Sequence, residues 1–283
     1  MPSEETAQWE VTAVALGRER EASGTGADRV LEAVRLLADH PRPVRLEEFA
    51  RELGAAKSTT HRVLLTLRRA GFAEQDEEGR YRLSLEFLRM AFRHYESLDD
   101  RNIVQSALEL LRDRFGETVY YARLDGAEVV YLAMVTAPGF LHTAALVGER
   151  RPAYRTSLGK ALLSQTLADR AAVDRFVQRY GPLQAATPNT LTNAAALDRD
   201  LRATRARGYG IDNAENEPGV VCIAYPVFLG PQSEPTGAIS VAAIELRTPM
   251  KELLRRADEM REVIELCLGA DAISPPRPKE AVE

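Results

Sequence analysis

Residues 46–71 hold the feature that most constrains the fold of this chain, a pair of helical patterns joined by a very short connection. Apolar residues recur at helical spacing up to Leu53, and Gly54 follows, where the end of a helix favours a residue that tolerates positive φ. A second pattern runs on to Arg69 and ends in the same way at Gly71. Two helices in this arrangement form a helix-turn-helix.

The second helix, predicted from Ser58 to Arg69, divides its residues between two faces. Its inward face consists of Thr60, Val63, Leu64 and Leu67. Its outward face consists of Ser58, Thr59, Arg62, Thr66 and Arg69. From Leu53 through Ala73 there are four Lys or Arg residues and no Asp or Glu, although the whole chain has a formal net charge of -5. We therefore expect a locally positive surface on this helix.

A positive, hydroxyl-rich helix N-terminus fits a groove of duplex DNA. Ser and Thr donors suit phosphate oxygens, and His61 or Arg62 can reach base edges in the major groove. After Gly71, the extended segments FAEQ and RYRL flank the turn DEEG, which predicts a small hairpin, the wing. Its Arg80 and Arg82 are expected to face the sugar-phosphate backbone. The residues predicted to contact DNA are Arg45, Lys57, Ser58, Thr59, His61, Arg62 and Arg80.

Two other interpretations of this segment remain open. Ser58 can be an ordinary helix N-cap, with Arg62, Arg68 and Arg69 on a solvated face of a three-helix core. Alternatively, the winged helix binds another protein. Salt dependence separates that second interpretation from DNA binding, because phosphate contacts displace counterions and protein contacts largely do not.

The rest of the sequence predicts a second folded domain and a helix that leads to it. The predicted boundaries are a flexible tail at 1–26, a winged helix-turn-helix domain at 27–83, a linker helix at 84–100, an α+β domain at 101–272 and a flexible tail at 273–283. In the α+β domain, β-branched and aromatic runs surround Asp125-Gly126, a pair typical of hairpin turns, and helical patterns follow. The predicted fold class is therefore α+β, with a mainly helical N-terminal domain and an antiparallel sheet with flanking helices.

Three segments resemble the IclR family of bacterial transcriptional regulators. They run from DRVLEAVRLL to EEGRYRL, over RPAYRTSLGKALL and over GYGIDNAENEPGVVCIAYPVF, in the family's order and spacing. Thr60 departs from the family pattern, which usually has an apolar residue there. The resemblance implies a GAF-like C-terminal domain that binds a small, often acidic or aromatic effector and alters DNA binding.

The resemblance also implies an assembly and a DNA partner. Family members dimerise through the DNA-binding domain and the adjoining helix, so we expect a homodimer or a dimer of dimers on a double-stranded, pseudo-palindromic operator. The side chains of the linker helix that can supply the contact are Phe87, Met90, Ala91 and Tyr95.

The segment TSLGKALL supports an anion site on physical grounds as well. Thr156 or Ser157 can cap a helix whose free N–H groups and dipole point at an anion, and Gly159 lets a ligand approach the backbone closely. The resemblance adds Asp212, as the acceptor of a hydrogen bond from a hydroxyl or amide, and Cys222. A carboxylate-bearing effector is the expected ligand.

The predicted effector-binding residues are Leu141, Leu146, Tyr154, Arg155, Ser157, Leu158, Gly159, Asp212 and Cys222. A packed core explains the two isolated leucines and the tyrosine equally well. Arg155 can either pair with an acidic effector or extend into solvent. The other polar members also have ordinary explanations, as a turn residue for Asp212, a small core residue for Cys222 and an N-cap for Ser157.

Other functional classes find little support in the sequence. Ser157 and Lys160 match an S-x-x-K motif, but the further motifs of serine acyl-transfer enzymes are absent, as is a P-loop, so we expect neither an enzyme nor a cofactor. The four histidines and two cysteines show no metal-ligand spacing, and His142 with Cys222 is the only pair to check. The acidic N-terminus, the few cysteines and the short apolar runs favour a cytoplasmic protein that does not contact membranes.

Overall fold

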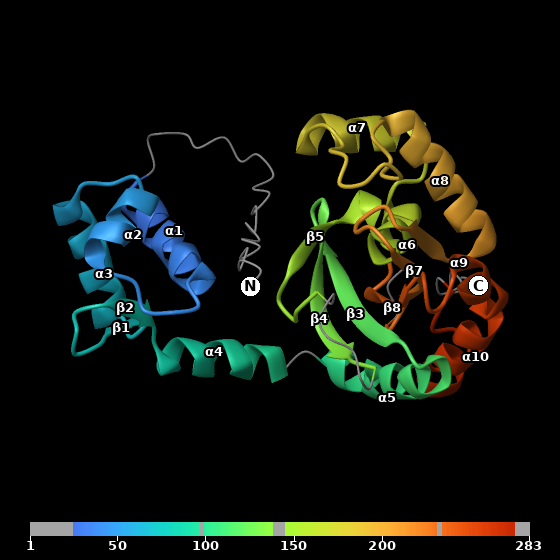
Figure 1. Cartoon of the computed structure of the whole chain (residues 1–283), viewed down its shortest axis with the longest axis horizontal. Coiled ribbons are helices and arrows are strands. Elements are labelled where there is room, and N and C mark those ends of the chain that lie inside the picture. The colour runs from blue at the N-terminus through green and yellow to red at the C-terminus, as the bar shows by residue number, and fades with distance from the viewer. Residues whose placement is uncertain (1–24, 97–98, 138–144, 231–233, 275–283) are drawn as a thin grey trace, which may run out of the picture. The chain divides into compact units, whose positions relative to one another are not determined.

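The computed structural model describes residues 25–96, 99–137, 145–230 and 234–274 (Figure 1). The chain divides into two compact units, with the boundary between Leu98 and Asp99. Each unit has a hydrophobic core of its own. Leu141, His142 and most of the two predicted tails lie outside the described residues.

The first unit, in its described part, contains helices and one small antiparallel hairpin. The elements are α1 (Gly26–Asp39), α2 (Leu46–Glu52), α3 (Lys57–Arg69), β1 (Ala73–Gln75), β2 (Tyr81–Leu83) and α4 (Leu85–Glu96). Ala73 lies opposite Leu83 in the hairpin, which is the predicted wing. The core contains Phe49 of α2 and Leu64 of α3, both fully buried. This unit is the predicted winged helix-turn-helix.

Local signals define the ends of the helices in this unit. α1 begins with a capping box, in which the Thr25 side chain accepts a hydrogen bond from the Asp28 N–H and the Asp28 carboxylate accepts one from the Thr25 N–H. After α2 and α3, Gly54 and Gly71 have φ values of 63° and 79°, in the left-handed region that only glycine adopts readily. Both helices therefore end where the sequence predicts.

The inward face of α3 consists of the four predicted residues. They are Thr60, Val63, Leu64 and Leu67. The Thr60 hydroxyl donates to the Ala56 carbonyl at 3.2 Å, so the one polar group on this face is satisfied within the core. Ala56 is the N-cap of α3 and makes no side-chain capping bond. The interpretation of Ser58 as an N-cap is therefore wrong, because Ser58 lies inside the first turn.

The second unit is built on a six-stranded antiparallel sheet with the strand order β5-β4-β3-β8-β7-β6. The strands are β3 (Thr118–Asp125), β4 (Glu128–Val135), β5 (Arg150–Pro152), β6 (Gly210–Asn213), β7 (Val220–Val227) and β8 (Gly237–Ile244). The helices are α5 (Asp99–Phe115), α6 (Ser157–Thr166), α7 (Arg170–Tyr180), α8 (Ala194–Arg207), α9 (Met250–Arg255) and α10 (Ala257–Leu268), with a 3-10 turn at Ala153–Arg155. The predicted α+β class is confirmed.

Helices cover both faces of the sheet and form two cores (Figure 1). α5 and α10 pack on one face, where Tyr121 and Ile223 are buried. α6, α7 and α8 pack on the other face, where Tyr120 and Ala224 are buried. Neighbouring residues of one strand thus enter different cores, because successive side chains point to opposite faces of a sheet.

Two details of this unit differ from the sequence analysis. The sequence has one continuous helical pattern from Met250 to Cys267, but the structure divides it into α9 and α10 at Arg256, which has φ -100° and ψ 10°. The Arg256 guanidinium lies 3.9 Å from the centre of the Phe115 ring, so a contact with α5 accompanies the break. The edge strands β5 and β6 were not predicted, because they are only three and four residues long and too short for a clear alternating pattern.

Within the described residues, we find no helix with the length and hydropathy that a membrane span requires.

Candidate functional sites

The first candidate site is the exposed, N-terminal half of α3. Lys57, Ser58, His61 and Arg62 are exposed, and Thr59 is half-buried. The outward face predicted from the helical period is therefore present. In the described part of the chain, neither His61 nor Arg62 forms an ion pair, so both side chains remain available to a ligand in front of the helix.

Several basic side chains near α3 are already paired with acidic ones. Lys57 Nζ lies 2.5 Å from Glu47 Oε1, and Arg80 of the wing lies 2.8 Å from Asp76 Oδ2. Arg82 forms a third such pair. These acidic partners lie on α2 and in the wing, outside the segment from Leu53 through Ala73 in which the sequence predicts a positive surface. Exposed ion pairs contribute little to stability, so replacing the carboxylates by DNA phosphate groups requires little free energy.

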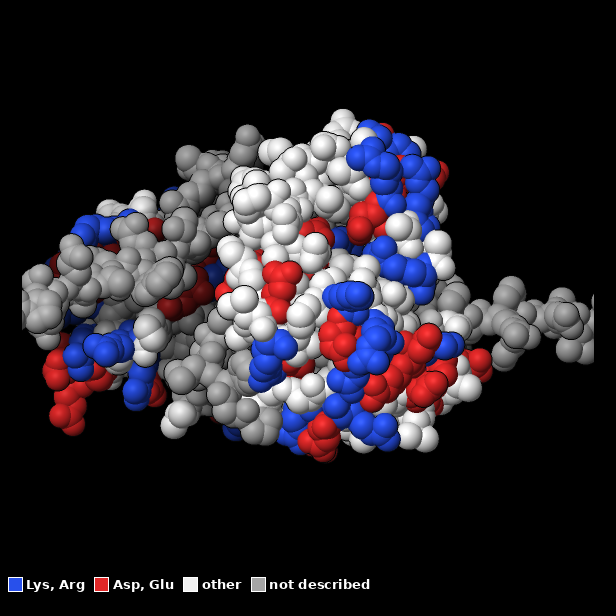
Figure 2. Space-filling model, turned by 45° about the vertical axis from the view of Figure 1, so that its right-hand side comes forward, with Lys and Arg blue, Asp and Glu red and all other residues white. Residues whose placement is uncertain are grey.

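One part of the surface of the second unit shows mixed charge. In the lower right of Figure 2, acidic and basic side chains of the second unit lie next to one another. The pairs Arg255–Glu252 and Arg261–Asp258 belong to this unit and are exposed helical i,i+3 pairs. Such a surface offers no continuous positive region to a polyanion.

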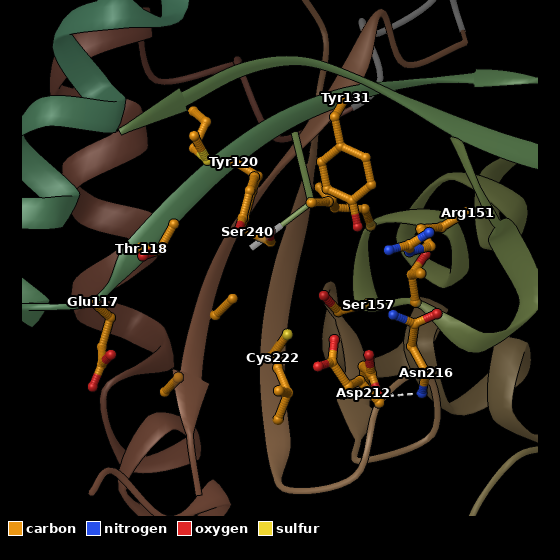
Figure 3. Close-up of a pocket in the computed structure, with 18 of the residues that line it drawn as sticks. Glu117, Thr118, Tyr120, Tyr131, Arg151, Ser157, Asp212, Asn216, Cys222 and Ser240 are labelled. Carbon is orange, nitrogen blue, oxygen red and sulfur yellow. Dashed lines mark hydrogen bonds between the residues drawn. The ribbon is translucent and has the colours of Figure 1, made fainter. Parts of the chain in front are cut away.

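The second candidate site is a pocket on the α6 side of the sheet (Figure 3). Strands β3, β4, β7 and β8 form its floor, and the start of α6 and the loop after β6 close one end. The polar and aromatic residues that line it are Glu117, Thr118, Tyr120, Tyr131, Thr136, Arg151, Thr156, Ser157, Asp212, Asn216, Glu217, Cys222 and Ser240. Met134, Leu158, Val220, Ile244 and three alanines complete the wall.

The start of α6 supplies hydrogen-bond donors to this pocket. The Thr156 side chain caps the helix by accepting a hydrogen bond from the Gly159 N–H at 3.0 Å. No described group accepts a hydrogen bond from the N–H of Ser157 or Leu158. These two N–H groups, together with the helix dipole, favour an anion at this end of the pocket.

Asp212 and Cys222 lie opposite each other on β6 and β7, at the same end of the pocket as Ser157 (Figure 3). Burial raises the pKa of Asp212 to about 7. Burial also raises the pKa of the Cys222 thiol well above its usual value, so this group is neutral at physiological pH. The pocket therefore contains a titratable acid and a neutral thiol side by side.

Two tyrosines form an aromatic wall that the sequence analysis did not identify. The rings of Tyr120 and Tyr131 meet edge to face, with centroids 5.2 Å apart. Burial raises the pKa of both hydroxyl groups, so each is a neutral hydrogen-bond donor. The period of two residues predicts the face on which each ring lies within its own strand. Only the register between β3 and β4 brings the two rings together.

Arg151 on β5 is the arginine that lines the pocket, and the sequence analysis did not single it out. Its Nη1 lies 2.5 Å from Glu149 Oε1. Glu217 lines the same pocket, and its pKa is raised by burial although Arg151 opposes that effect. The cation is thus shared between carboxylates, and an anionic ligand has to compete for it.

Ser157, Leu158, Asp212 and Cys222 are the predicted residues that line the pocket. Tyr154 does not line it, because its hydroxyl donates to the Gln184 carbonyl at 2.7 Å and its ring lies in the core. These two observations support the core interpretation of Tyr154.

Three further predictions about this site are corrected by the geometry. Arg155 neither meets the pocket nor extends freely into solvent, because its Nε donates to Asn216 Oδ1 at 2.9 Å. Leu146 is 59% exposed and lies outside the pocket. At Gly159 an added Cβ would lie 2.1 Å from the Ala153 carbonyl oxygen. This glycine therefore permits close packing of α6 on the 3-10 turn rather than the approach of a ligand.

A buried ion cluster lies next to the pocket. Lys160 of α6 is fully buried, with its Nζ 2.6 Å from Glu215 Oε1 and 3.4 Å from Asp200 Oδ2. This cluster connects α6, α8 and the loop that follows β6. Within the described ranges, no group of three or more His, Cys, Asp or Glu side chains has the arrangement of a metal site.

Comparisons with known proteins agree with this division into two units. The family model described as "IclR helix-turn-helix domain" matches residues 26–77, and the model described as "Bacterial transcriptional regulator IclR C-terminal" matches residues 93–267. The chain is 34% identical over 259 residues to the HTH-type transcriptional regulator BhcR of Paracoccus denitrificans, which covers 90% of each chain. It is 32% identical to the transcriptional repressor IclR of Escherichia coli, over 76% of this chain and 78% of the other.

Solved structures show the same architecture. A putative transcriptional regulator from Rhodococcus sp. RHA1 has a TM-score of 0.72 and 25% identity, and the match covers 88% of this chain and 98% of that chain. The inducer-binding domain of the Acinetobacter transcription factor PobR has a TM-score of 0.52 and 29% identity, over 58% of this chain and 95% of that chain.

Proposed function

Because the chain belongs to the IclR family of bacterial transcriptional regulators, we propose that a small carboxylic acid in the pocket of its second unit controls sequence-specific operator binding by α3. The family assigns DNA binding to the helix-turn-helix domain and effector binding to the C-terminal domain, and its members are not enzymes. The observation that carries the proposal is that the N–H groups of Ser157 and Leu158, at the N-terminus of α6, face the pocket without an acceptor among the described residues.

On the DNA side, the contacts divide by chemistry. His61 and Arg62 are exposed and unpaired with acids within the described residues, so they are the proposed base-reading side chains. Lys57, Ser58 and Thr59 at the helix start are the proposed phosphate contacts, with Arg45 and Arg80 on the flanks. DNA is the target of this surface, so we also infer that the protein acts in the cytoplasm.

On the effector side, the pocket offers places for a carboxylate and for a ring. The carboxylate is proposed to accept hydrogen bonds from the N–H groups of Ser157 and Leu158. Tyr120, Tyr131 and Met134 are proposed to hold an apolar or aromatic body. Two structures support this class, because an IclR homolog from Microbacterium hydrocarbonoxydans was solved with 4-hydroxybenzoate and a double mutant of the PobR domain with 3-hydroxybenzoic acid.

We further propose that the protein represses as a homodimer or a dimer of dimers. The described part of α4 has no buried residue, and Leu85, Leu88 and Phe92 are exposed by 74%, 42% and 58%. An apolar helix face of this kind favours a partner copy. Of the predicted contacts, Phe87 already packs on Phe72 within the unit, so we assign it a smaller part in the dimer.

The test is footprinting of the purified protein on the DNA upstream of its own gene, with and without a panel of aromatic and aliphatic carboxylic acids. We expect one protected pseudo-palindromic site whose occupancy changes with at least one acid. Absence of a protected site with every acid, for folded protein, contradicts the proposal.

Arg62→Ala tests the DNA contact directly. We expect about a tenfold to hundredfold loss of operator affinity, since a good base contact contributes about 1–3 kcal/mol, with unchanged thermal stabilisation by the acid. The matched control is Arg175→Ala, an exposed arginine of α7 in the second unit, which changes the charge equally and should leave operator affinity unchanged.

The alternative is that the winged helix binds a protein. The salt dependence of binding separates the two, because release of counterions from phosphates gives a steep slope of log K against log salt. A flat slope favours the protein partner.

A further inference from the structure

Asp212 is a buried acid at the end of the pocket where the proposed function places the carboxylate of the effector. Its side chain is only 3% exposed. Oδ1 accepts hydrogen bonds from the backbone N–H groups of Glu215 at 2.7 Å and Asn216 at 3.3 Å. For Oδ2, no described group acts as a donor. One oxygen of this buried carboxyl group is therefore satisfied and the other is left for the contents of the pocket.

The nearest buried cation does not neutralise Asp212. Lys160 forms a 2.6 Å ion pair with Glu215 and also lies 3.4 Å from Asp200. Two carboxylates therefore already share one ammonium group. Among the described residues, Asp212 takes part in no ion pair.

The other groups around Asp212 do not supply a spare positive charge either. The titratable and charged groups that act on it or face it are Glu215 and Glu217 from the loop after β6, Lys160 from α6, Cys222 from β7, Tyr131 from β4, Arg151 from β5 and Arg155 from the 3-10 turn. Arg151 is paired with Glu149, and Arg155 donates to Asn216. The thiol and the phenol are neutral because burial raises their pKa values. An anionic ligand therefore enters a region that already holds uncompensated negative charge.

Protonation of Asp212 removes this repulsion between the ligand and the buried carboxylate. Burial raises the pKa of Asp212 to about 7, so the acid gains a proton easily near neutral pH. A second carboxylate placed beside it raises that pKa further, because two like charges in one buried site cannot both stay ionised. A protonated carboxyl group also has the O–H donor that a ligand carboxylate requires.

We propose that Asp212 is protonated in the effector-bound protein and donates a hydrogen bond through Oδ2 to a carboxylate oxygen of the effector. The proton comes from solvent, so binding of the anion consumes one proton wherever the free protein has Asp212 ionised. Asp212 is thus a hydrogen-bond donor that favours effectors with a carboxylate. The sequence analysis predicted it as a hydrogen-bond acceptor. This inference rests on the proposed carboxylic acid effector.

Calorimetry with benzoate and 4-hydroxybenzoate as probes measures the proton directly. Titrations of the full chain at one pH, in two buffers that both work at that pH, differ in heat by the number of protons exchanged multiplied by the difference between the ionisation enthalpies of the buffers. At pH 8.5 we expect uptake of about one proton per ligand, falling toward zero at pH 5.5, where Asp212 is protonated beforehand. Above about pH 7 the association constant should fall roughly tenfold per pH unit, and below about pH 6 it should level off.

Two variants identify the group that takes the proton. Asp212→Asn keeps an oxygen for the two backbone N–H groups and presents an N–H donor to the ligand without titrating. We expect it to bind at pH 8.5 at least as well as the wild type, with no proton uptake. Glu217→Gln removes a second acid of the same pocket and should retain the uptake of one proton.

The outcomes separate this inference from the function on which it rests. If neither probe nor any acid of the footprinting panel binds at pH 5.5, the proposed effector class fails and the role of Asp212 fails with it. If a probe binds with equal affinity at pH 5.5 and pH 8.5 and no proton is taken up, the effector class survives and the inference about Asp212 is overturned. Loss of the uptake in Glu217→Gln but not in Asp212→Asn overturns it as well.

Discussion

The starts of α3 and α6 contain similar chemistry in opposite environments. Both carry hydroxyl side chains next to the free N–H groups of a helix N-terminus, yet Ser58 is exposed and Ser157 is buried. In water, charges near α3 are screened and pair loosely with neighbours, which suits a large polyanion held by many weak contacts. Around α6 the same dipole acts on buried groups of a pocket, where burial shifts protonation, which suits one small anion.

The largest expected effect comes from removing the buried cation beside the pocket. Lys160→Met leaves Glu215 without its ion-pair partner and Asp200 with only Arg207, 3.9 Å away, and breaking a buried pair of this kind typically costs about 3–5 kcal/mol. Urea unfolding followed by circular dichroism measures the loss. The counterpart Lys57→Met removes an exposed pair on α3 and should leave the midpoint unchanged. Equal losses would mean that burial does not distinguish the two regions.

The next effect is a pH dependence of stability that belongs to Asp212. Its folded pKa of about 7 lies above the value of 3.8 for an unperturbed aspartate, so the folded state binds more protons between these limits. The contribution of this group to the free energy of unfolding therefore decreases as pH rises from about 4 to 7, by roughly 1.4 kcal/mol per pH unit at most. The difference in melting temperature between Asp212→Asn and wild type should therefore grow in favour of the variant from pH 5 to pH 8. A constant difference contradicts the raised pKa.

Gly159→Ala should destabilise the second unit by about 1–3 kcal/mol, because the new Cβ would overlap the backbone of Ala153, 2.1 Å from its carbonyl oxygen. Displacement of the α6 start should also weaken binding of the acid. Gly54→Ala is the counterpart in the first unit, where the Cβ meets open space and only the φ of 63° is unfavourable, by roughly 1 kcal/mol. Melting curves of both variants measure the difference, and a larger loss for Gly54→Ala would contradict the packing role of Gly159.

The smallest effect is expected on the wing. Arg80→Ala replaces a side chain that is paired with Asp76 in the free protein, so folding stability should not change measurably. Its proposed contact is with phosphate, so operator affinity should fall by a similar factor for every sequence and the salt slope should decrease by about one. Gel-shift titrations at several salt concentrations test this. A loss confined to one operator sequence would instead indicate a base contact.

The helix-turn-helix was predictable because its signals are local. The 3.6-residue period separates Val63 and Leu64 from Arg62, and Gly54 and Gly71 define the helix ends, without knowledge of any distant residue. The acidic residues that pair with this surface could not be predicted from the sequence in the same way. Glu47 and Asp76 lie outside the basic segment, and only folding brings them beside Lys57 and Arg80.

The pocket was predictable only where a motif marked it. Ser157, Asp212 and Cys222 were identified partly by family resemblance, whereas Tyr120, Tyr131 and Arg151 were missed. No local pattern distinguishes these three from other strand residues. Their positions follow from the order β5-β4-β3-β8-β7-β6, which places residues from distant segments on one face.

The amino-acid sequence by itself determined the helices of the first unit, the α+β class and the family, because periodicity, turn residues and motifs are properties of neighbouring residues. Tertiary structure alone decided which side chains meet in the pocket and which charges are paired. Strand register, burial and the distance between charges arise when segments far apart in the chain pack together, and they set the protonation of Asp212 as well.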